Sequence, residues 1–235
     1  MKTGVKMLAV MLFTLSLPVS VLAGSGDHGN PGVVQPQSHV HGLTYAQWSV
    51  RWWQWLLAIP ADQNPTLDTT GEDCAVGQSG QVWFLAGTPG GSVTRTCTVP
   101  PGTSLFFPIV NAEMDYPCPD PTFQPAPGQS LEAFLTEEVR ALVDLVSDVR
   151  LEVDGRAVTK LDDFRVTSSL FYFTGDPSLT AVFDSCITGS SQPAVSDGYW
   201  VMLAPLSRGT HTIHFGGKFA AIGFETEATY TLTVE

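Results

Sequence analysis

A series of short apolar segments, separated by glycine and proline, fills most of the chain after position 80 and limits what it can fold into. The chain holds 22 Gly and 17 Pro in 235 residues, and alternation of apolar with polar side chains is typical of half-buried strands. The pattern predicts a mainly β fold, a two-layer β-sandwich or jelly-roll-like domain with two peripheral helices. Strands are expected at 81–85, 92–99 (returning from the first as in a hairpin), 105–110, 149–153, 157–158, 164–173, 180–183, 198–203, 209–217 and 226–234.

Two segments have the signals of helices. Thr44 can cap a helix over 45–58, and Pro60 ends it because proline cannot continue a helix. Ser130 can cap a second helix with an apolar face and exposed acidic side chains. Both helices are expected to lie at the edge of the β-rich domain.

The first helix contains four tryptophans within eight residues. Most of its aromatic side chains recur at a spacing of three or four, which places them on one helical face. Such a face usually packs into the core, although it is also a candidate platform for stacking sugars. Trp53 is off this face and is expected to be the exposed ring. The face consists of Tyr45, Trp48, Trp52, Trp55 or Leu56, and Ile59.

The amino terminus has the three parts of a cleaved secretory signal. Lys2 and Lys6 precede an apolar stretch at 7–17, and small or modest residues follow at 21–23. A stretch of 11 residues is short of the roughly 20 that span a membrane. We expect a secreted or periplasmic protein with no membrane span after cleavage. The expected organisation is a signal peptide at 1–23, a flexible mature terminus at 24–42 and a single domain at 43–235.

The mature chain is acidic. Loss of Lys2 and Lys6 leaves 9 basic and 23 acidic side chains and a net charge of −14. Nucleic acids and anionic lipids are bound by clustered Lys and Arg, so nucleic acid is excluded as a partner. With 43% apolar and 14% charged residues, the composition is that of a globular protein.

Four cysteines remain after cleavage, and an even number in an exported chain favours two disulfides. Of the three pairings, we prefer Cys74–Cys97, which brackets one glycine-rich stretch, together with Cys118–Cys186. A zinc site is disfavoured because no two cysteines have the C-x2-C spacing.

The densest group of polar side chains follows the strand expected at 105–110. Asn111, Glu113, Asp115 and Asp120 leave that strand and enter a proline-rich loop, and loops held by rigid strands often carry function. Glu113 and Asp115 share a face if the segment is extended, as a pair of catalytic carboxylates would. The same oxygens suit calcium, and the simplest alternative is that they only solvate the loop. No other cofactor is expected.

Three further patterns carry weaker signals. The acidic stretch 62–73 lacks the glycine and glutamate of an EF-hand loop and is interpreted as turns. His39 and His41 border a flexible tail, and His211 and His214 point to opposite faces of a strand, so no metal site is predicted. The chain has no Gly-x-Ser-x-Gly nucleophile motif and no phosphate-binding glycine loop.

Several segments resemble an uncharacterised family of secreted bacterial proteins with a tryptophan-rich N-terminal helix. The segments that carry the resemblance are 45–55, 77–87, 95–102 and 209–217. The resemblance implies an exported bacterial protein, and it implies no activity and no functional residues.

Three functions remain open on the sequence. The first is a secreted, non-catalytic binding protein for a glycan or for a partner on the cell surface or envelope, with Trp53, Asn111, Glu113, Asp115 and Asp120 as contacts. The second is a secreted hydrolase with Glu113 and Asp115 as acid and base. The third is a structural component of an envelope or extracellular assembly, and the sequence leaves the oligomeric state open.

Overall fold

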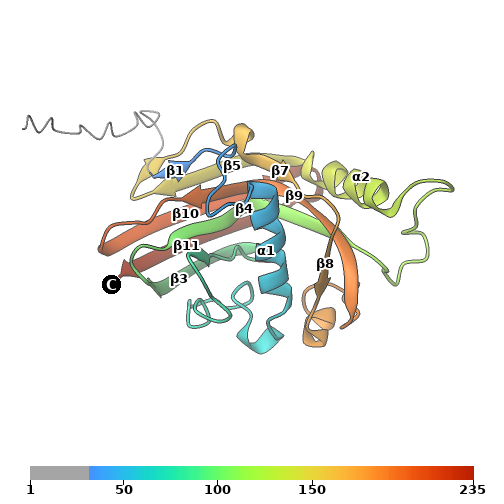
Figure 1. The fold of residues 1–235 in the computed structure, drawn as a ribbon, viewed down its shortest axis with the longest axis horizontal. Coiled ribbons are helices and arrows are strands. Elements are labelled where there is room, and N and C mark those ends of the chain that lie inside the picture. The colour runs from blue at the N-terminus through green and yellow to red at the C-terminus, as the bar shows by residue number, and fades with distance from the viewer. Residues whose placement is uncertain (1–31) are drawn as a thin grey trace, which may run out of the picture.

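The computed structural model describes residues 32–235, which form a mainly β fold with 11 strands in two sheets (Figure 1). The first sheet has the order β1 (Val33–Val34), β9 (Ser191–Leu203), β4 (Ser104–Asp115) and β2 (Val82–Phe84), and β7 (Arg165–Thr167) and β8 (Phe171–Thr174) also pair with β9. The second sheet has the order β3 (Gly91–Val99), β11 (Phe224–Val234), β10 (Gly209–Phe219), β5 (Val146–Val153) and β6 (Arg156–Ala157). The predicted fold class, a β-sandwich with two α-helices, is confirmed.

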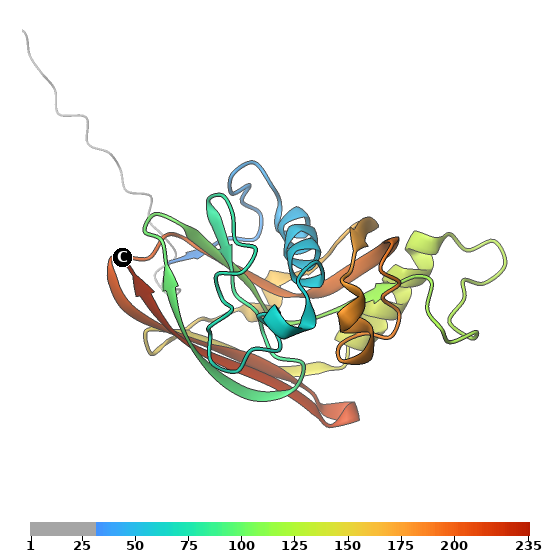
Figure 2. The ribbon, with the colours of Figure 1, turned by 90° about the horizontal axis from the view of Figure 1, so that it is seen from below.

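The first sheet is covered on both faces. On one face α1 (Tyr45–Leu57) crosses the strands, and the rings of Trp52 and Trp200 lie 5.4 Å apart, edge to face. On the other face the Phe107 ring lies 4.8 Å from Phe215 of the second sheet. Figure 2 shows α1 on one side of the molecule and β10 and β11 curving along the other. Because both faces are buried, the chain is continuously apolar where these strands cross the core, from Leu105 to Val110 in β4 and from Tyr199 to Leu203 in β9.

The first helix begins and ends where the sequence predicts. The Thr44 side chain accepts a hydrogen bond from the Gln47 backbone N–H, and the Gln47 side chain accepts one from the Thr44 N–H, which makes a capping box. The predicted apolar face is in the core. The prediction that Trp53 is the exposed ring is wrong: its side chain is 5% exposed, and its ring packs edge to face 5.0 Å from the Trp52 ring.

The second helix, α2 (Leu131–Val143), is capped by the Ser130 side chain as predicted and lies at the end of the molecule opposite the C-terminus (Figure 1). Its buried side chains Phe134, Leu135 and Val139 form a small cluster with Val195 of β9. Ala112 and Met114 of β4 pack against this cluster. The far half of the first sheet is therefore covered by α2, where the second sheet no longer reaches.

Both predicted disulfides are present, Cys74–Cys97 and Cys118–Cys186, and no cysteine of the described residues is free. Disulfides of this kind persist in oxidising compartments outside the cytoplasm. No helix within residues 32–235 is long and apolar enough to cross a membrane. The predicted signal peptide, 1–23, lies outside the described residues.

Three strand predictions are wrong. The segments 81–85 and 92–99 form no hairpin: β2 pairs parallel with β4 and β3 pairs parallel with β11 in the other sheet. The segment 180–183 is not a strand: it covers the end of the 3-10 helix η3 (Pro177–Ala181) and the turn after it. The Asp176 side chain caps η3, and Pro177 begins it. The segment 164–173 is divided between the 3-10 helix η2 (Leu161–Phe164), β7 and β8.

The ordered structure also starts before the expected domain boundary at 43. Val33 and Val34 pair with Leu203 and Met202, and the Val34 carbonyl accepts a hydrogen bond from the Tyr45 hydroxyl. This part of the segment 24–42, predicted as a flexible terminus, is thus a strand at the edge of the first sheet. Residues 24–31 of that segment lie outside the described residues.

A β-bulge in the central strand decides which side chains reach the site described below. The pairing of β4 with β9 shifts between Pro108 and Val110, where one extra residue is inserted. Before the bulge, Phe106 faces α1 and packs on Tyr45. After the bulge the alternation changes phase, so that Asn111, Glu113 and Asp115 continue the face under α1, while Ala112 and Met114 face α2.

Arg95 of β3 is a buried charge that ties connecting segments of the chain to the second sheet. Its guanidinium is buried at 1% exposure, and it donates to the backbone carbonyls of Thr66, Asp68, Ala86 and Gly87. It also donates to the Tyr230 hydroxyl. These bonds hold the segment that crosses from β2 to β3.

We predict that Arg95→Leu lowers the free energy of unfolding by at least about 3 kcal/mol, because several buried carbonyls lose a charged donor at once. Urea unfolding of the oxidised protein measures this loss. The matched control is Arg208→Leu, an exposed arginine, which should change stability by no more than about 0.5 kcal/mol. Equal effects of the two substitutions would contradict the role given to Arg95.

Candidate functional site

A pocket of about 330 Å³ lies at the end of β4 and is lined by five acidic side chains and by no basic one. We call it the acidic pocket. Three of its carboxyl groups, those of Glu113, Asp115 and Asp184, interact directly with one another. The other lining residues are Met114, Cys118, Asp120, Phe123, Glu138 and Cys186.

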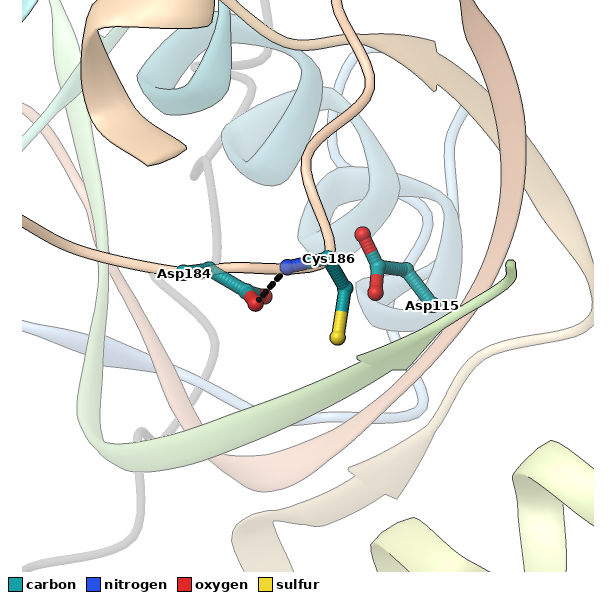
Figure 3. Close-up of side chains that lie close together, drawn as sticks. All are labelled: Asp115, Asp184 and Cys186. Carbon is teal, nitrogen blue, oxygen red and sulfur yellow. Dashed lines mark hydrogen bonds between the residues drawn. The ribbon is translucent and has the colours of Figure 1, made fainter. Parts of the chain in front are cut away.

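Two parts of the chain far apart in sequence build this pocket. Glu113 and Asp115 come from β4, after its bulge, and Asp184 comes from the loop after η3. Figure 3 shows Asp115 and Asp184 on these two parts of the chain. The Cys118–Cys186 disulfide joins the two parts directly beside the carboxylates. The 3-10 helix η3 that precedes this loop is tied to the end of α1, since the N–H of its capping residue Asp176 donates to the Leu57 carbonyl at 2.8 Å.

Gln192 of β9 holds Asp115 in place. It is 1% exposed, and its amide nitrogen donates to Asp115 Oδ2 and to the Cys186 carbonyl. Its amide oxygen accepts from the Thr188 N–H at 2.7 Å. Asp184 is fixed in its turn, because it accepts the Cys186 N–H at 2.8 Å (Figure 3). Asp115 and Asp184 are therefore held in position before any ligand arrives.

The pocket keeps protons on its carboxyl groups. Burial first, and then the charges of Asp115 and Asp184, raise the pKa of Glu113 well above its usual value. Glu113 also shares a hydrogen bond with Asp184 that favours its protonated form. Burial, followed by the charge of Asp184, raises the pKa of Asp115 to about 7, against the opposing hydrogen bond from Gln192. Near neutral pH the pocket thus carries less negative charge than its five carboxyl groups allow.

One oxygen in the pocket has no partner. Glu113 Oε2 is covered from solvent and accepts no hydrogen bond from any residue that the structure describes. A buried polar atom without a partner costs free energy, on the order of 1–3 kcal/mol. An unpartnered carboxylate oxygen beside other carboxylates is typical of a cation-binding site.

The donor atoms suit a hard cation. Carboxylate oxygens of Asp115 and Asp184 and the Cys186 sulfur lie within 4.8 Å of one another. Because Cys186 is in a disulfide, its sulfur is not a thiolate and does not serve as a metal ligand. The oxygen donors that remain, with Glu113, are of the type that calcium and magnesium prefer.

A second, more aromatic pocket of about 110 Å³ lies farther along the same face of β4. We call it the aromatic pocket. Trp52, Trp53 and Leu56 of α1 line it, together with Asn111 of β4 and Phe183 of the loop after η3. The other lining residues are Thr66, Gly87, Thr88, Pro89, Pro108, Ile109, Val110, Phe224 and Thr226.

The structure divides the predicted site residues between the two pockets. Glu113 and Asp115 are in the acidic pocket, with exposed Asp120 at its rim. Asn111 and Trp53 are in the aromatic pocket. The expectation that Asn111, Glu113 and Asp115 follow the strand is wrong, since β4 runs to Asp115 and its backbone pairs with β9 up to Ala194.

Sequence analysis missed Asp184, Gln192 and Glu138. A signal for Asp184 was present: it stands two residues before Cys186, whose predicted partner Cys118 follows Asp115 by three. The disulfide therefore brings the two aspartates close to each other. Gln192 gave no such signal, because its position depends on the pairing of β9 with β4.

The other candidate patterns are structural. The Asp68 carboxylate accepts backbone N–H groups of Thr70, Gly71 and Asp73, which confirms turns in the stretch 62–73. His211 hydrogen-bonds Asp154 and His214 hydrogen-bonds Glu227, so the two histidines do not meet. The groups of possible metal ligands found within residues 32–235 include no histidine.

No protein-family model matches this chain, and no curated protein matches it either. The resemblance to secreted bacterial proteins stays a prediction from the sequence. Function must therefore be argued from the two pockets themselves.

We predict that the acidic pocket makes the protein less stable as pH rises from about 4 to about 7. In that window the unfolded chain has released the protons of Glu113 and Asp115, with pKa values near 4, while the folded protein still holds them. The contribution of these two groups to the free energy of unfolding is fully present below about pH 4. It is lost as pH rises through the raised pKa values, by up to about 4 kcal/mol for Asp115.

Thermal melts of the oxidised protein between pH 4.5 and 8 measure this effect. The double variant Glu113→Gln/Asp115→Asn should lose most of the decline. The control Asp120→Asn should keep it, because hydrogen bonds from Thr122 lower the pKa of Asp120 and move its titration below that window. A double variant with the same pH profile as the wild type would refute the protonated state described for the pocket.

Proposed function

We propose that this protein is an exported, non-catalytic binding protein that holds a divalent cation, calcium, in the acidic pocket and uses it to bind a glycan of the cell surface or envelope. The observation that carries the proposal is the group of Glu113, Asp115 and Asp184, in which the pKa values of Glu113 and Asp115 are raised and a buried oxygen of Glu113 has no hydrogen-bond partner. A cation would replace the protons and stabilise the three charges together. The predicted signal and the two disulfides support a secreted or periplasmic location.

The charge of the pocket selects the kind of ligand. Five acidic side chains line it, no basic side chain does, and the whole chain has a net charge of −12. An anionic ligand would be repelled unless a cation came first. This favours a bound cation, or a neutral ligand that reaches the protein through one.

Calcium also accounts for a glycan as the second ligand. It takes 6–8 oxygen ligands, and three carboxylates supply about half of these when some bind through one oxygen. The remaining positions would be open to water or to hydroxyl groups of a sugar, since the pocket of about 330 Å³ has room beside the carboxylates. Phe123 lines the same pocket and offers apolar contact to the face of a sugar ring.

We predict that calcium added to chelator-treated, oxidised protein raises the melting temperature at pH 8, and much less at pH 5.5. Protons compete for Asp115 and Glu113 at the lower pH. Asp184→Asn should reduce calcium affinity by at least tenfold, as measured by calorimetry, because it removes one of three charged ligands.

The matched control is Asp163→Asn, an exposed aspartate of η2 outside the pocket, which should leave affinity unchanged. A glycan array screened with calcium and again with chelator then tests the second step. Absence of calcium binding at pH 8 would refute the cation site, whereas calcium binding with a blank array would refute only the glycan.

A secreted hydrolase is the second candidate, and one observation favours it. Glu113 and Asp115 lie side by side with pKa values raised to different degrees, as in an acid and base pair. Such an enzyme needs one proton to remain in the pocket, so calcium would inhibit it, whereas the binding function requires calcium.

We predict for the hydrolase that Glu113→Gln abolishes turnover of a polysaccharide while the melting curve stays nearly the same. A panel of neutral polysaccharides, assayed by release of reducing ends between pH 5 and 8, tests it. Turnover that survives in Glu113→Gln, or no turnover by the wild type on any member, would count against catalysis.

A further inference from the structure

The aromatic pocket contains two buried hydrogen-bond donors without partners. Trp53 Nε1 and Asn111 Nδ2 are both covered from solvent and donate to no residue that the structure describes. Both side chains line this one pocket, although they come from α1 and β4. Trp53 itself is 5% exposed, so its donor has no alternative partner in bulk water.

An unpartnered indole is not by itself a sign of a ligand. Trp83 and Trp200 also have buried Nε1 atoms without partners, and neither lines the aromatic pocket. Trp53 differs because its ring faces a cavity and a second unpartnered donor lines the same cavity. Two donors around one space are the arrangement that binds a single acceptor oxygen.

The remaining polar groups of the wall are already engaged. The hydroxyl groups of Thr66, Thr88 and Thr226 donate to backbone carbonyls of Gly87, Gly90 and Thr88. No charged side chain lines the pocket. The pocket therefore offers two neutral donors in an apolar setting, which fits a neutral acceptor and not a carboxylate or phosphate.

The size of the pocket limits the ligand. An engineered cavity of about 150 Å³ holds benzene, with its six heavy atoms. In proportion, a pocket of about 110 Å³ encloses about four or five heavy atoms, which is most of a five-membered ring that carries one oxygen. The rings of Trp52, Trp53, Phe183 and Phe224 line the pocket and would contact the apolar part of such a group.

We propose that the aromatic pocket is a binding site for a small neutral carbonyl group, whose oxygen accepts hydrogen bonds from Trp53 Nε1 and Asn111 Nδ2. The apolar part of the ligand packs between α1 and Phe183. This site depends on different atoms from the acidic pocket, so failure of the calcium proposal would not refute it.

Two matched probes test the proposal, cyclopentanone and cyclopentane, which are rings of similar size that differ in the carbonyl oxygen. The readout is the indole N–H signals of ¹⁵N-labelled, oxidised protein, with the Trp53 signal identified by its loss in Trp53→Phe. Cyclopentanone should shift the Trp53 signal in a saturable manner and leave the Trp83 and Trp200 signals in place. Cyclopentane should bind at least tenfold more weakly, the value of about one good hydrogen bond.

Two variants and one control make the result specific. Trp53→Phe and Asn111→Ala should each weaken cyclopentanone binding by about tenfold, measured for Trp53→Phe by shifts of methyl groups in the pocket. Trp83→Phe, which removes an equally unpartnered donor elsewhere, should leave it unchanged. Equal binding of both probes would overturn the role of the donors. No saturable shift with either probe would mean that the pocket holds water only, and would overturn the site.

Discussion

The pairing of β4 with β9 is the interaction on which the rest of this structure depends. The ladder runs from Leu105 opposite Leu203 to Asp115 opposite Ala194 and is interrupted only by the bulge between Pro108 and Val110. Before the bulge the strand contributes Phe106 and Phe107 to the two sides of the core; after it, the same strand contributes polar side chains to the face under α1. One inserted residue reverses which side chains of β4 point to each face of the sheet. The same strand therefore contributes to the core before the bulge and lines both pockets after it.

The acidic pocket shows how this scaffold tolerates an unfavourable arrangement. Three carboxyl groups lie close together, and one of them, that of Glu113, has a buried oxygen without a hydrogen-bond partner. The repulsion among them lowers the stability of the fold above about pH 7, where Asp115 also ionises. The surrounding structure holds them there: the Cys118–Cys186 disulfide closes the loop, Gln192 bonds Asp115, and α2 covers the opposite side of the strand. A strained group of this kind is a common property of functional sites, because the binding of a ligand can relieve its cost.

The sequence was sufficient for the elements whose signals are local. The helix caps at Thr44 and Ser130 depend on neighbouring residues, and both are confirmed. The two disulfides were expected from the even number of cysteines, and both are present. Features that depend on distant pairing could not be read in this way. The exposure predicted for Trp53 was wrong because helical periodicity does not show that distant residues, such as Phe183, line the same pocket as its ring. The strand beyond Val110 was missed because its side chains are polar although its backbone is paired with β9.

The loop after η3 joins the two pockets more closely than their chemistry suggests. Phe183 lines the aromatic pocket and its neighbour Asp184 lines the acidic pocket, while Asn111 and Glu113 stand two residues apart on β4 in the same order. A cation bound between Asp184 and Glu113 would also restrain the backbone of Phe183, because Phe183 and Asp184 are consecutive residues. Coupling between two bound ligands is reciprocal. A ligand bound against Phe183 would therefore change the affinity of the acidic pocket for a cation by the same factor by which the cation changes the affinity for that ligand. The disulfide at Cys186 holds one end of this loop, and the hydrogen bond from Asp176 to Leu57 holds the start of η3 before it. Such coupling is therefore confined to the residues between Asp176 and Cys186.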